Sequence, residues 1–345
     1  MTLSVCIIFH NQKQFIKRCL DSILSQKINF DYEILLSDDN STDGTWEELL
    51  EWKTKHPDLI SCYRINTNDY NPVSNSQRSG LNRFNIYKEA KGKYITFIDG
   101  DDYVLDETRY QQQIDLLEAN PDCSICAGNT ALYQEAESPV FMSLMMPEKR
   151  FKTGSKFTQK QFFNMFFHNS TCIMKRQENI ASIFKPELLV DFQMTLFHLN
   201  FGNLIYIDKP FLSYIQQPKG IYTSISQYRK YIGSITETAN LLLFFPQLKK
   251  QIKADFSNSI FYLLETSETG EFSEEDKKKL NYVSDRLYKQ IITLNNKNTL
   301  FKSRIKFLHF VQRALNKLKI NKIFSIYPIV YSICKVKKQT FKYGA

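Results

Sequence analysis

Short apolar runs alternate with amphipathic segments along the part of the chain before residue 226. Runs that are rich in β-branched residues and bounded by polar turns are typical of strands buried on both faces of a sheet. We expect five such strands, at residues 3–9, 32–36, 61–65, 94–98 and 123–127.

Amphipathic helices are predicted between these strands, because apolar residues recur there every three or four positions. The first helix begins near Asn11 and carries Phe15, Leu20 and Leu24 on one face. Further helices are expected at about 46–52, 81–90 and 106–117. Strands that alternate with helices predict an α/β fold with a parallel, doubly wound sheet.

Beyond the fifth strand the pattern is less regular. We expect a helix at 188–199 and two short strands at 204–207 and 211–214, and nearly every segment beyond residue 226 has helical spacing. The sequence therefore predicts an α/β domain over 1–225, followed by an all-helical, basic C-terminal region over 226–345.

The fourth strand ends in three carboxylates, Asp99, Asp101 and Asp102, within four positions. The carboxyl ends of central parallel strands form the edge at which α/β sheets bind ligands. Like charges this close repel one another unless a cation joins them, and carboxylate oxygens suit Mg²⁺ or Mn²⁺. Because these ions also bind substrate phosphates, the pattern favours a site for a metal and a diphosphate. The alternative is an acidic turn that caps the next helix.

Length and composition indicate a folded protein with a large core, since 43% of the 345 residues are hydrophobic. No stretch approaches 18 consecutive apolar residues, and the N-terminal segment lacks the basic start of a signal peptide. The seven cysteines show no framework spacing, and Cys123 and Cys126 are more consistent with buried thiols than with a zinc site. We therefore expect a cytoplasmic protein.

Basic charge is concentrated in the last third of the chain. Residues 1–240 carry 25 basic and 28 acidic side chains, whereas residues 241–345 carry 20 basic and 8 acidic ones. From Arg286 onward there are 14 Lys or Arg and no Asp or Glu. Six apolar residues in this segment share one helical stripe: Phe301, Ile305, Leu308, Val311, Leu315 and Leu318. The combination predicts that 286–345 binds an anionic membrane surface, and a plain helical cap on the catalytic domain is the alternative.

Four sequence elements now occur in order: an apolar strand at 5–11, the acidic segment 38–45, Gly-Lys-Tyr-Ile at 92–95, and the acid cluster 99–102. In these elements the chain resembles a family 2 glycosyltransferase with the GT-A fold, over roughly residues 3–225. The resemblance implies a Rossmann-like, mostly parallel sheet flanked by helices. It also implies transfer of a sugar from a nucleotide diphosphate sugar, most simply a UDP-sugar, to a glycan or lipid-linked glycan acceptor.

The resemblance implies that the nucleotide binds where the first two strands end. Asp39 would accept a hydrogen bond from the uracil ring, although helix capping is its ordinary role. The family's usual Thr-Tyr is replaced by Phe9 and His10 before Asn11, so stacking on the base would fall to His10. Arg83 matches an arginine that would hold the diphosphate.

The resemblance also assigns the metal and the base. Asp101 would face the ribose and the metal, and Asp102 would bind the metal. Asp191 matches an aspartate that serves as general base, which implies inversion at the anomeric carbon. The residue before it is Val190 rather than the usual Glu, so Glu187 is the alternative base. Around Gln216 a histidine that is usual in the family is also absent.

Two other classes of function fit less well. A nucleotidyltransferase would show a glycine-rich phosphate loop after the first strand, and residues 9–15 contain no glycine. The basic C-terminal third contains no recognisable module for RNA or DNA, so no nucleic-acid partner is expected. A protein that binds nucleotide sugars or anionic surfaces without catalysis stays open as an alternative.

Overall fold

The computed structural model describes residues 1–70, 75–134, 139–162, 165, 167–178, 180, 191–216, 241, 245–248 and 251–252. The chain divides into two compact units, Met1–Thr223 and Ser224–Ala345. In the second unit the described residues include a short 3₁₀ turn, η5 (Pro246–Leu248). The helices predicted beyond residue 226 and the basic segment 286–345 lie outside the described residues.

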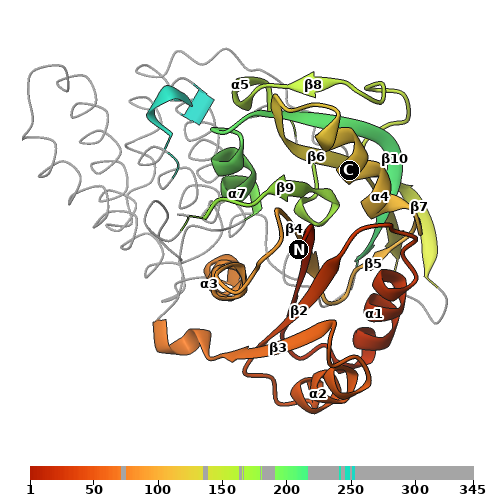
Figure 1. Cartoon of the computed structure of the whole chain (residues 1–345), viewed down its shortest axis with the longest axis vertical. Coiled ribbons are helices and arrows are strands. Elements are labelled where there is room, and N and C mark those ends of the chain that lie inside the picture. The colour runs from red at the N-terminus through yellow and green to blue at the C-terminus, as the bar shows by residue number, and fades with distance from the viewer. Residues whose placement is uncertain are drawn as a thin grey trace, which may run out of the picture. The chain divides into compact units, whose positions relative to one another are not determined.

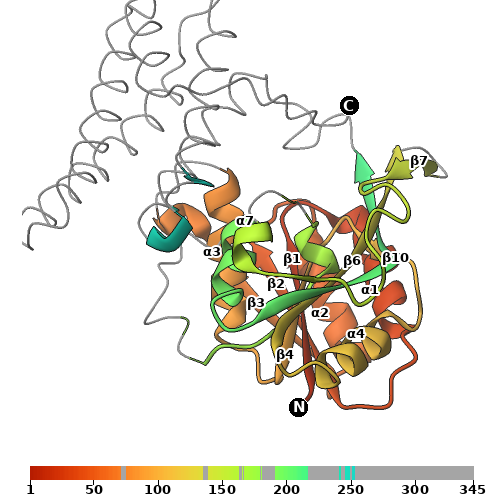
Figure 2. The same ribbon diagram turned by 90° about the horizontal axis from the view of Figure 1, so that it is seen from above.

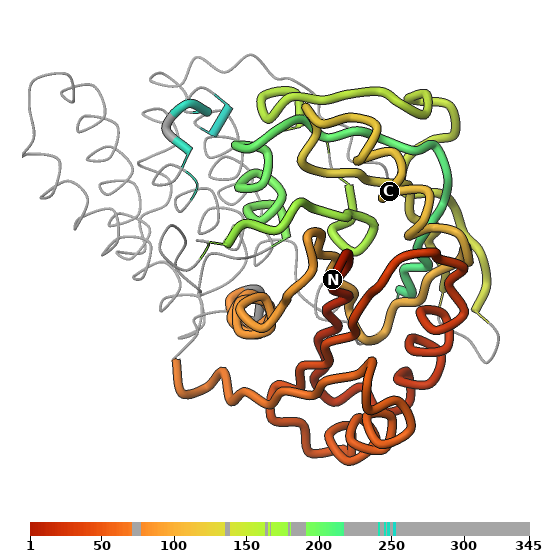
Figure 3. The backbone as a smooth tube through the Cα atoms, viewed as in Figure 1, coloured from red at the N-terminus to blue at the C-terminus, as the bar shows by residue number. Residues whose placement is uncertain are grey.

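The first half of the sheet is parallel and matches the predicted strands. It contains β1 (Leu3–Phe9), β2 (Tyr32–Asp39), β3 (Ile60–Ile65) and β4 (Tyr94–Asp99), in the spatial order β3-β2-β1-β4. Figure 3 follows the backbone from β1 outward to β3 and back into β4. Every residue of β1 is buried, as expected for a strand covered on both faces.

The second half of the sheet is mixed. The order continues β9 (Ile173–Lys175), β6 (Cys123–Gln134), β10 (Asn203–Gln216) and β5 (Tyr103–Val104), with β7 (Val140–Leu144) on β6 and β8 (Lys156–Phe157) on β10. Strand β6 runs parallel to β10, whereas β9 is antiparallel to both β4 and β6. The two strands expected at 204–207 and 211–214 form one strand, β10, with register irregularities on either side of Pro210, which has no N–H to donate.

Helices cover both faces of the sheet. Figures 1 and 2 show α1 (Ile16–Leu24), α2 (Thr45–Lys55) and α4 (Arg109–Glu118) on one side, and α3 (Asn75–Tyr87) and α7 (Asp191–His198) on the other. Short elements complete the unit: η1 (Lys13–Phe15), η2 (Thr67–Tyr70), α5 (Gln159–Phe162) and η3 (Asn169–Thr171). Among the described residues, no helix is long and apolar enough to span a membrane.

Candidate functional site

The acid cluster lies where β4 ends. Asp99 is the last residue of β4, and the chain then turns so that the N–H of Asp102 donates to the carbonyl of Asp99 at 2.9 Å. Gly100 allows this turn, because a Cβ there would lie 2.2 Å from the buried ring of Phe9. Phe9, one of the residues predicted to contact the donor, therefore packs beneath the acidic turn.

The negative charge of this turn is poorly compensated. Asp102 is 2% exposed, and its Oδ2 has no hydrogen-bond partner among the described residues. Burial, together with the charges of Asp101 and Asp99, raises the pKa of Asp102 well above its ordinary value. Burial and the charge of Asp99 likewise raise the pKa of Asp101 to about 6. A divalent cation would relieve this repulsion, so these residues fit the predicted metal.

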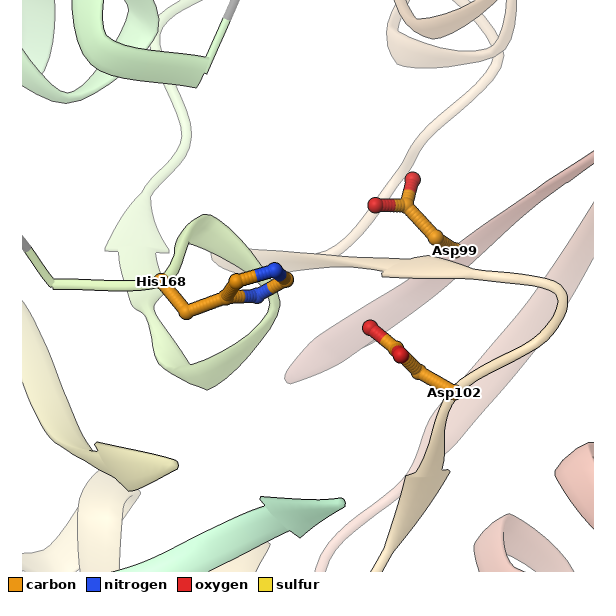
Figure 4. A group of neighbouring side chains, drawn as sticks. All are labelled: Asp99, Asp102 and His168. Carbon is orange, nitrogen blue, oxygen red and sulfur yellow. The ribbon is translucent and has the colours of Figure 1, made fainter. Parts of the chain in front are cut away.

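A histidine joins two of the acids. Ligand atoms of Asp99, Asp102 and His168 all lie within 4.8 Å of one another, and Figure 4 shows the imidazole pointing toward the two carboxylates. His168 is 8% exposed, and its Nδ1 has no hydrogen-bond partner in the described part of the chain. Burial lowers the pKa of His168, which favours the neutral ring that can bind a metal.

The group of three shares one residue with the predicted metal ligands. It contains Asp102 and, in addition, Asp99 and His168, and it does not contain Asp101, the other predicted ligand. His168 was not predicted, because it lies in the irregular stretch after residue 131, where no spacing connects it with the acids.

Antiparallel pairing of β9 brings His168 to the acids. Thr96 of β4 pairs with Ile173 of β9, and the Thr96 hydroxyl donates to the carbonyl of Cys172 at 2.8 Å. Because β9 runs opposite to β4, the residues that precede β9 lie beside the carboxyl end of β4. The segment 168–171 is therefore carried to the same end of the sheet as Asp99 and Asp102.

Arg83 connects the acid cluster with the predicted base. Its guanidinium is 4% exposed and forms an ion pair with Asp99 at 2.6 Å and a second, shorter one with Asp191. The Nε–H of Arg83 is buried and has no partner among the residues that the structure describes. Asp191, Arg83 and the acid cluster were predicted from separate motifs, and the structure brings them together.

Helices α3 and α7 contact each other at two points, Arg83 with Asp191 and Tyr87 with His198. Arg83 and Tyr87 are four residues apart on α3, and Asp191 and His198 are two turns apart on α7, so each pair lies on one helix face. The hydroxyl of Tyr87 donates to His198 Nε2 at 3.2 Å, and His198 Nδ1 donates to the carbonyl of Met194 at 2.9 Å. The second contact anchors α7 and thereby positions Asp191.

The loops after β1 and β2 are hydrogen-bonded to each other. His10 Nδ1 donates to the carbonyl of Asp39 at 2.8 Å, and the Thr42 N–H donates to Asn11 Oδ1 at 2.9 Å. Asn11 adopts a left-handed backbone with φ of 53°, a conformation that asparagine tolerates well. His10 is exposed beside these loops, as a ring that stacks on a base must be.

Asp39, the predicted reader of the uracil ring, is 3% exposed and already accepts several hydrogen bonds. The N–H and hydroxyl of Thr67 donate to its Oδ1 at 2.9 and 2.8 Å. Arg78 forms an ion pair with its Oδ2 at 3.0 Å. In this structure the carboxylate therefore faces Thr67 and Arg78.

Solved structures with the same architecture include Staphylococcus aureus TarS in complex with UDP-GlcNAc. That structure has a TM-score of 0.60 and 18% identity, over 97% of this chain and 92% of that chain. The likeness confirms the predicted fold, a GT-A type α/β sheet of mostly parallel strands flanked by helices.

Curated relatives cover shorter stretches. A poly(ribitol-phosphate) beta-glucosyltransferase of Bacillus spizizenii is 36% identical over 30% of this chain and 15% of its own length. A UDP-Glc:alpha-D-GlcNAc-diphosphoundecaprenol beta-1,3-glucosyltransferase of Escherichia coli is 34% identical over 34% of this chain and 41% of its own length. An uncharacterised protein of Mycobacterium tuberculosis is 20% identical over 64% of this chain, which spans 61% of that relative's length.

The sequence profile of glycosyl transferase family 2 matches residues 4–184, more than half of the 345 residues. That range includes β1 to β4, the acid cluster and His168, and it ends before Asp191. The chain belongs to glycosyl transferase family 2.

Proposed function

We propose that the chain is a metal-dependent, inverting glycosyltransferase that moves a sugar from a UDP-sugar to a glycan or lipid-linked glycan. The observation that carries the proposal is the acid cluster at the carboxyl end of β4, where Asp102 is buried with an unpartnered carboxylate oxygen and has ligand atoms of Asp99 and His168 within 4.8 Å. Unbalanced carboxylates at this edge of an α/β sheet suit a divalent ion and the diphosphate of a donor.

The metal would be held by Asp102 and Asp99, with Asp101 turned toward the ribose. When bound, the ion would offset the negative charge that builds up on the diphosphate as the bond to the sugar breaks. Arg83 contributes a second positive charge beside Asp99. Its unpartnered Nε–H is a donor for a phosphate oxygen, in line with the predicted role.

Asp191 would act as the general base. A single carboxylate that removes the proton of an acceptor hydroxyl, on the side opposite the leaving diphosphate, gives inversion at the anomeric carbon. The ion pair with Arg83 fixes the direction of the carboxylate. Glu187, the alternative base, lies outside the described residues.

The donor and acceptor classes are proposed from the relatives. TarS was solved in complexes with UDP and with UDP-GlcNAc, which supports a UDP-sugar, with Asp39 and His10 at the base. The named relatives act on poly(ribitol-phosphate) and on a diphosphoundecaprenol-linked sugar, and another relative is an abequosyltransferase of Salmonella typhimurium. We therefore propose an acceptor of the cell envelope and a cytoplasmic enzyme at the inner face of the membrane.

A thermal-shift panel tests the proposal. UDP, UDP-sugars, ADP-glucose and GDP-mannose are added to the full chain with and without Mn²⁺, and the melting temperature is recorded. A ligand at about 100 times its Kd stabilises the folded state by about 2.7 kcal/mol, which is a shift of several degrees. We expect this shift for UDP and for one UDP-sugar, and only with Mn²⁺. The proposed donor would be overturned if only purine nucleotides raised the melting temperature, or if none of the nucleotides raised it.

A further inference from the structure

We infer that His168 is the third protein ligand of the metal and that its imidazole makes the centre select Mn²⁺ over Mg²⁺. The inference rests on the proposed function, because it takes the metal at Asp99 and Asp102 as given. It adds to the proposed function a metal ligand from a different part of the chain and a preference for Mn²⁺ over Mg²⁺.

Two buried polar atoms of the cluster lack a hydrogen-bond partner. Asp102 Oδ2 and His168 Nδ1 are both buried without a hydrogen-bond partner among the described residues, and both side chains are more than nine-tenths buried. Buried polar atoms in native proteins are nearly always paired, so two orphan atoms in one cluster indicate a missing partner. A cation bound by Asp99, Asp102 and His168 provides it.

His198 of α7 is a second buried histidine among the described residues, and its hydrogen bonds differ from those of His168. His198 also is fully buried, and both its ring nitrogens are hydrogen-bonded, one to Met194 and one to Tyr87. This is how a histidine with a purely structural role satisfies its polar atoms. His168 differs, because one ring nitrogen is unpartnered and the ring points toward two carboxylates (Figure 4).

Buried side chains of α4 fix the loop that holds His168. Arg109 of α4 is fully buried and donates from Nη2 to the carbonyl of Ser170 at 2.6 Å and from Nε to Gln113 at 2.9 Å. Gln113 in turn donates to the carbonyl of Thr171 at 2.8 Å. Arg109 forms no ion pair with a carboxylate in the described part of the chain, so this buried cation serves the carbonyl of Ser170 and the side chain of Gln113. The main chain that follows His168 is therefore held in place before a metal arrives.

Ligand chemistry then decides between the ions. Mg²⁺ requires oxygen ligands in near-ideal octahedral geometry and is usually held by carboxylates, phosphates and waters. Imidazole nitrogen suits transition ions, and Mn²⁺ is the ion of that group that also suits carboxylate oxygen. Two carboxylates and one buried imidazole thus favour Mn²⁺ over Mg²⁺ and leave positions open for the phosphates of a donor.

The test uses the full chain without nucleotide. The electron paramagnetic resonance signal of free Mn²⁺ gives the Mn²⁺ affinity, competition gives the Mg²⁺ affinity, and pulsed measurements detect ¹⁴N coupled to the bound ion. We expect ¹⁴N coupling in the wild type and its loss in His168→Asn, which keeps a polar group but supplies oxygen. Mn²⁺ affinity should fall about tenfold or more, and Mg²⁺ affinity should change much less.

His198→Gln is the matched control. It removes a buried imidazole outside the cluster, so it should lower thermal stability yet keep the Mn²⁺ affinity and the ¹⁴N coupling. Bound Mn²⁺ without ¹⁴N coupling in the wild type, or unchanged coupling in His168→Asn, would overturn the inference and leave the proposed function intact. If the wild type binds no Mn²⁺ even with UDP present, the metal in the proposed function fails, and the inference fails with it.

Discussion

The carboxylates at the end of β4 offset the positive charge of Arg83, which allows its guanidinium to be buried. Its guanidinium lies between Asp99 and Asp191, and the nearby charge of Asp102 also favours the cation. Removing one partner of a buried ion pair is costly, because the other charge is left without compensation. Arg83 therefore connects the proposed metal ligand Asp99 with the proposed base Asp191.

Asp191→Asn tests the proposed base. The amide keeps the size of the side chain but cannot remove a proton, so kcat should fall by about 10² or more. UDP binding measured by calorimetry should stay within a few fold of the wild type, because Asp191 itself is not proposed to contact the nucleotide and Arg83 keeps its ion pair with Asp99. Transfer at a nearly normal rate would place the base on another residue, and Glu187→Gln would then be measured next.

The position of the acid cluster at a strand end could be predicted from the sequence, whereas the presence of His168 beside it could not. Asp99, Asp101 and Asp102 directly follow an apolar run, and a strand end is visible in the local pattern. His168 reaches the site only through the antiparallel pairing of Thr96 with Ile173. Such a pairing between distant segments leaves no local signal, because the histidine itself lies in an irregular stretch.

At the scale of the elements, α7 is held by its last turn. His198 contacts Tyr87 of α3, whose hydroxyl also accepts a hydrogen bond from the Gln177 N–H just after β9. The network joins α3, α7 and the end of β9. Its single titratable imidazole makes the stability of this region depend on pH.

His198→Gln should reduce the loss of stability in acid. Burial lowers the pKa of His198 to about 4, whereas in the unfolded chain it is about 6.5. Neutral His198 therefore stabilises the fold fully above pH 6.5, and this contribution is lost as the pH falls from there toward 4. Between pH 7 and pH 5 the free energy of unfolding should fall by about 2 kcal/mol more in the wild type than in the variant.

Urea unfolding at the two pH values measures this difference. Other groups that titrate in both proteins contribute equally to the two changes in the free energy of unfolding. Their contributions therefore cancel when the variant is compared with the wild type. An equal loss of stability in both proteins would show that His198 is protonated in the folded state at pH 5, and the proposed role of its neutral ring in anchoring α7 would be wrong.

Local pattern predicted the first half of the sheet well, and the second half less well. Strands β1 to β4 have the expected positions, because each is a short apolar run followed by an amphipathic helix. The antiparallel strand β9, which lies between β4 and β6, was not predicted. Its three residues are too few to show a pattern of apolar positions. Strand β10 was read as two strands because Pro210 interrupts its apolar run.

For the whole molecule, the family match and the basic charge lie in different parts of the chain. The profile ends at residue 184, and the 14 basic residues without a compensating acid begin at Arg286. The basic segment lies outside the described residues, so its role is still a prediction from charge and spacing.

The full chain should bind vesicles that contain anionic lipid and should be released by salt. Each lysine or arginine near such a surface contributes about 1 kcal/mol, and salt screens this attraction. A chain that ends at Asn298 should lose vesicle binding in a sedimentation assay and keep UDP binding. Equal sedimentation with neutral and anionic vesicles, or none with either, would contradict the membrane prediction.

The most direct measurement for the account as a whole is calorimetric titration of UDP, with and without Mn²⁺, into the wild type and Asp102→Asn. The central claim is that Asp99 and Asp102 at the end of β4 hold a divalent ion that binds the diphosphate. We expect Mn²⁺ to raise the UDP affinity of the wild type about tenfold or more and to leave that of a folded Asp102→Asn unchanged. An equal effect of Mn²⁺ on both proteins, or no effect on the wild type, would contradict it.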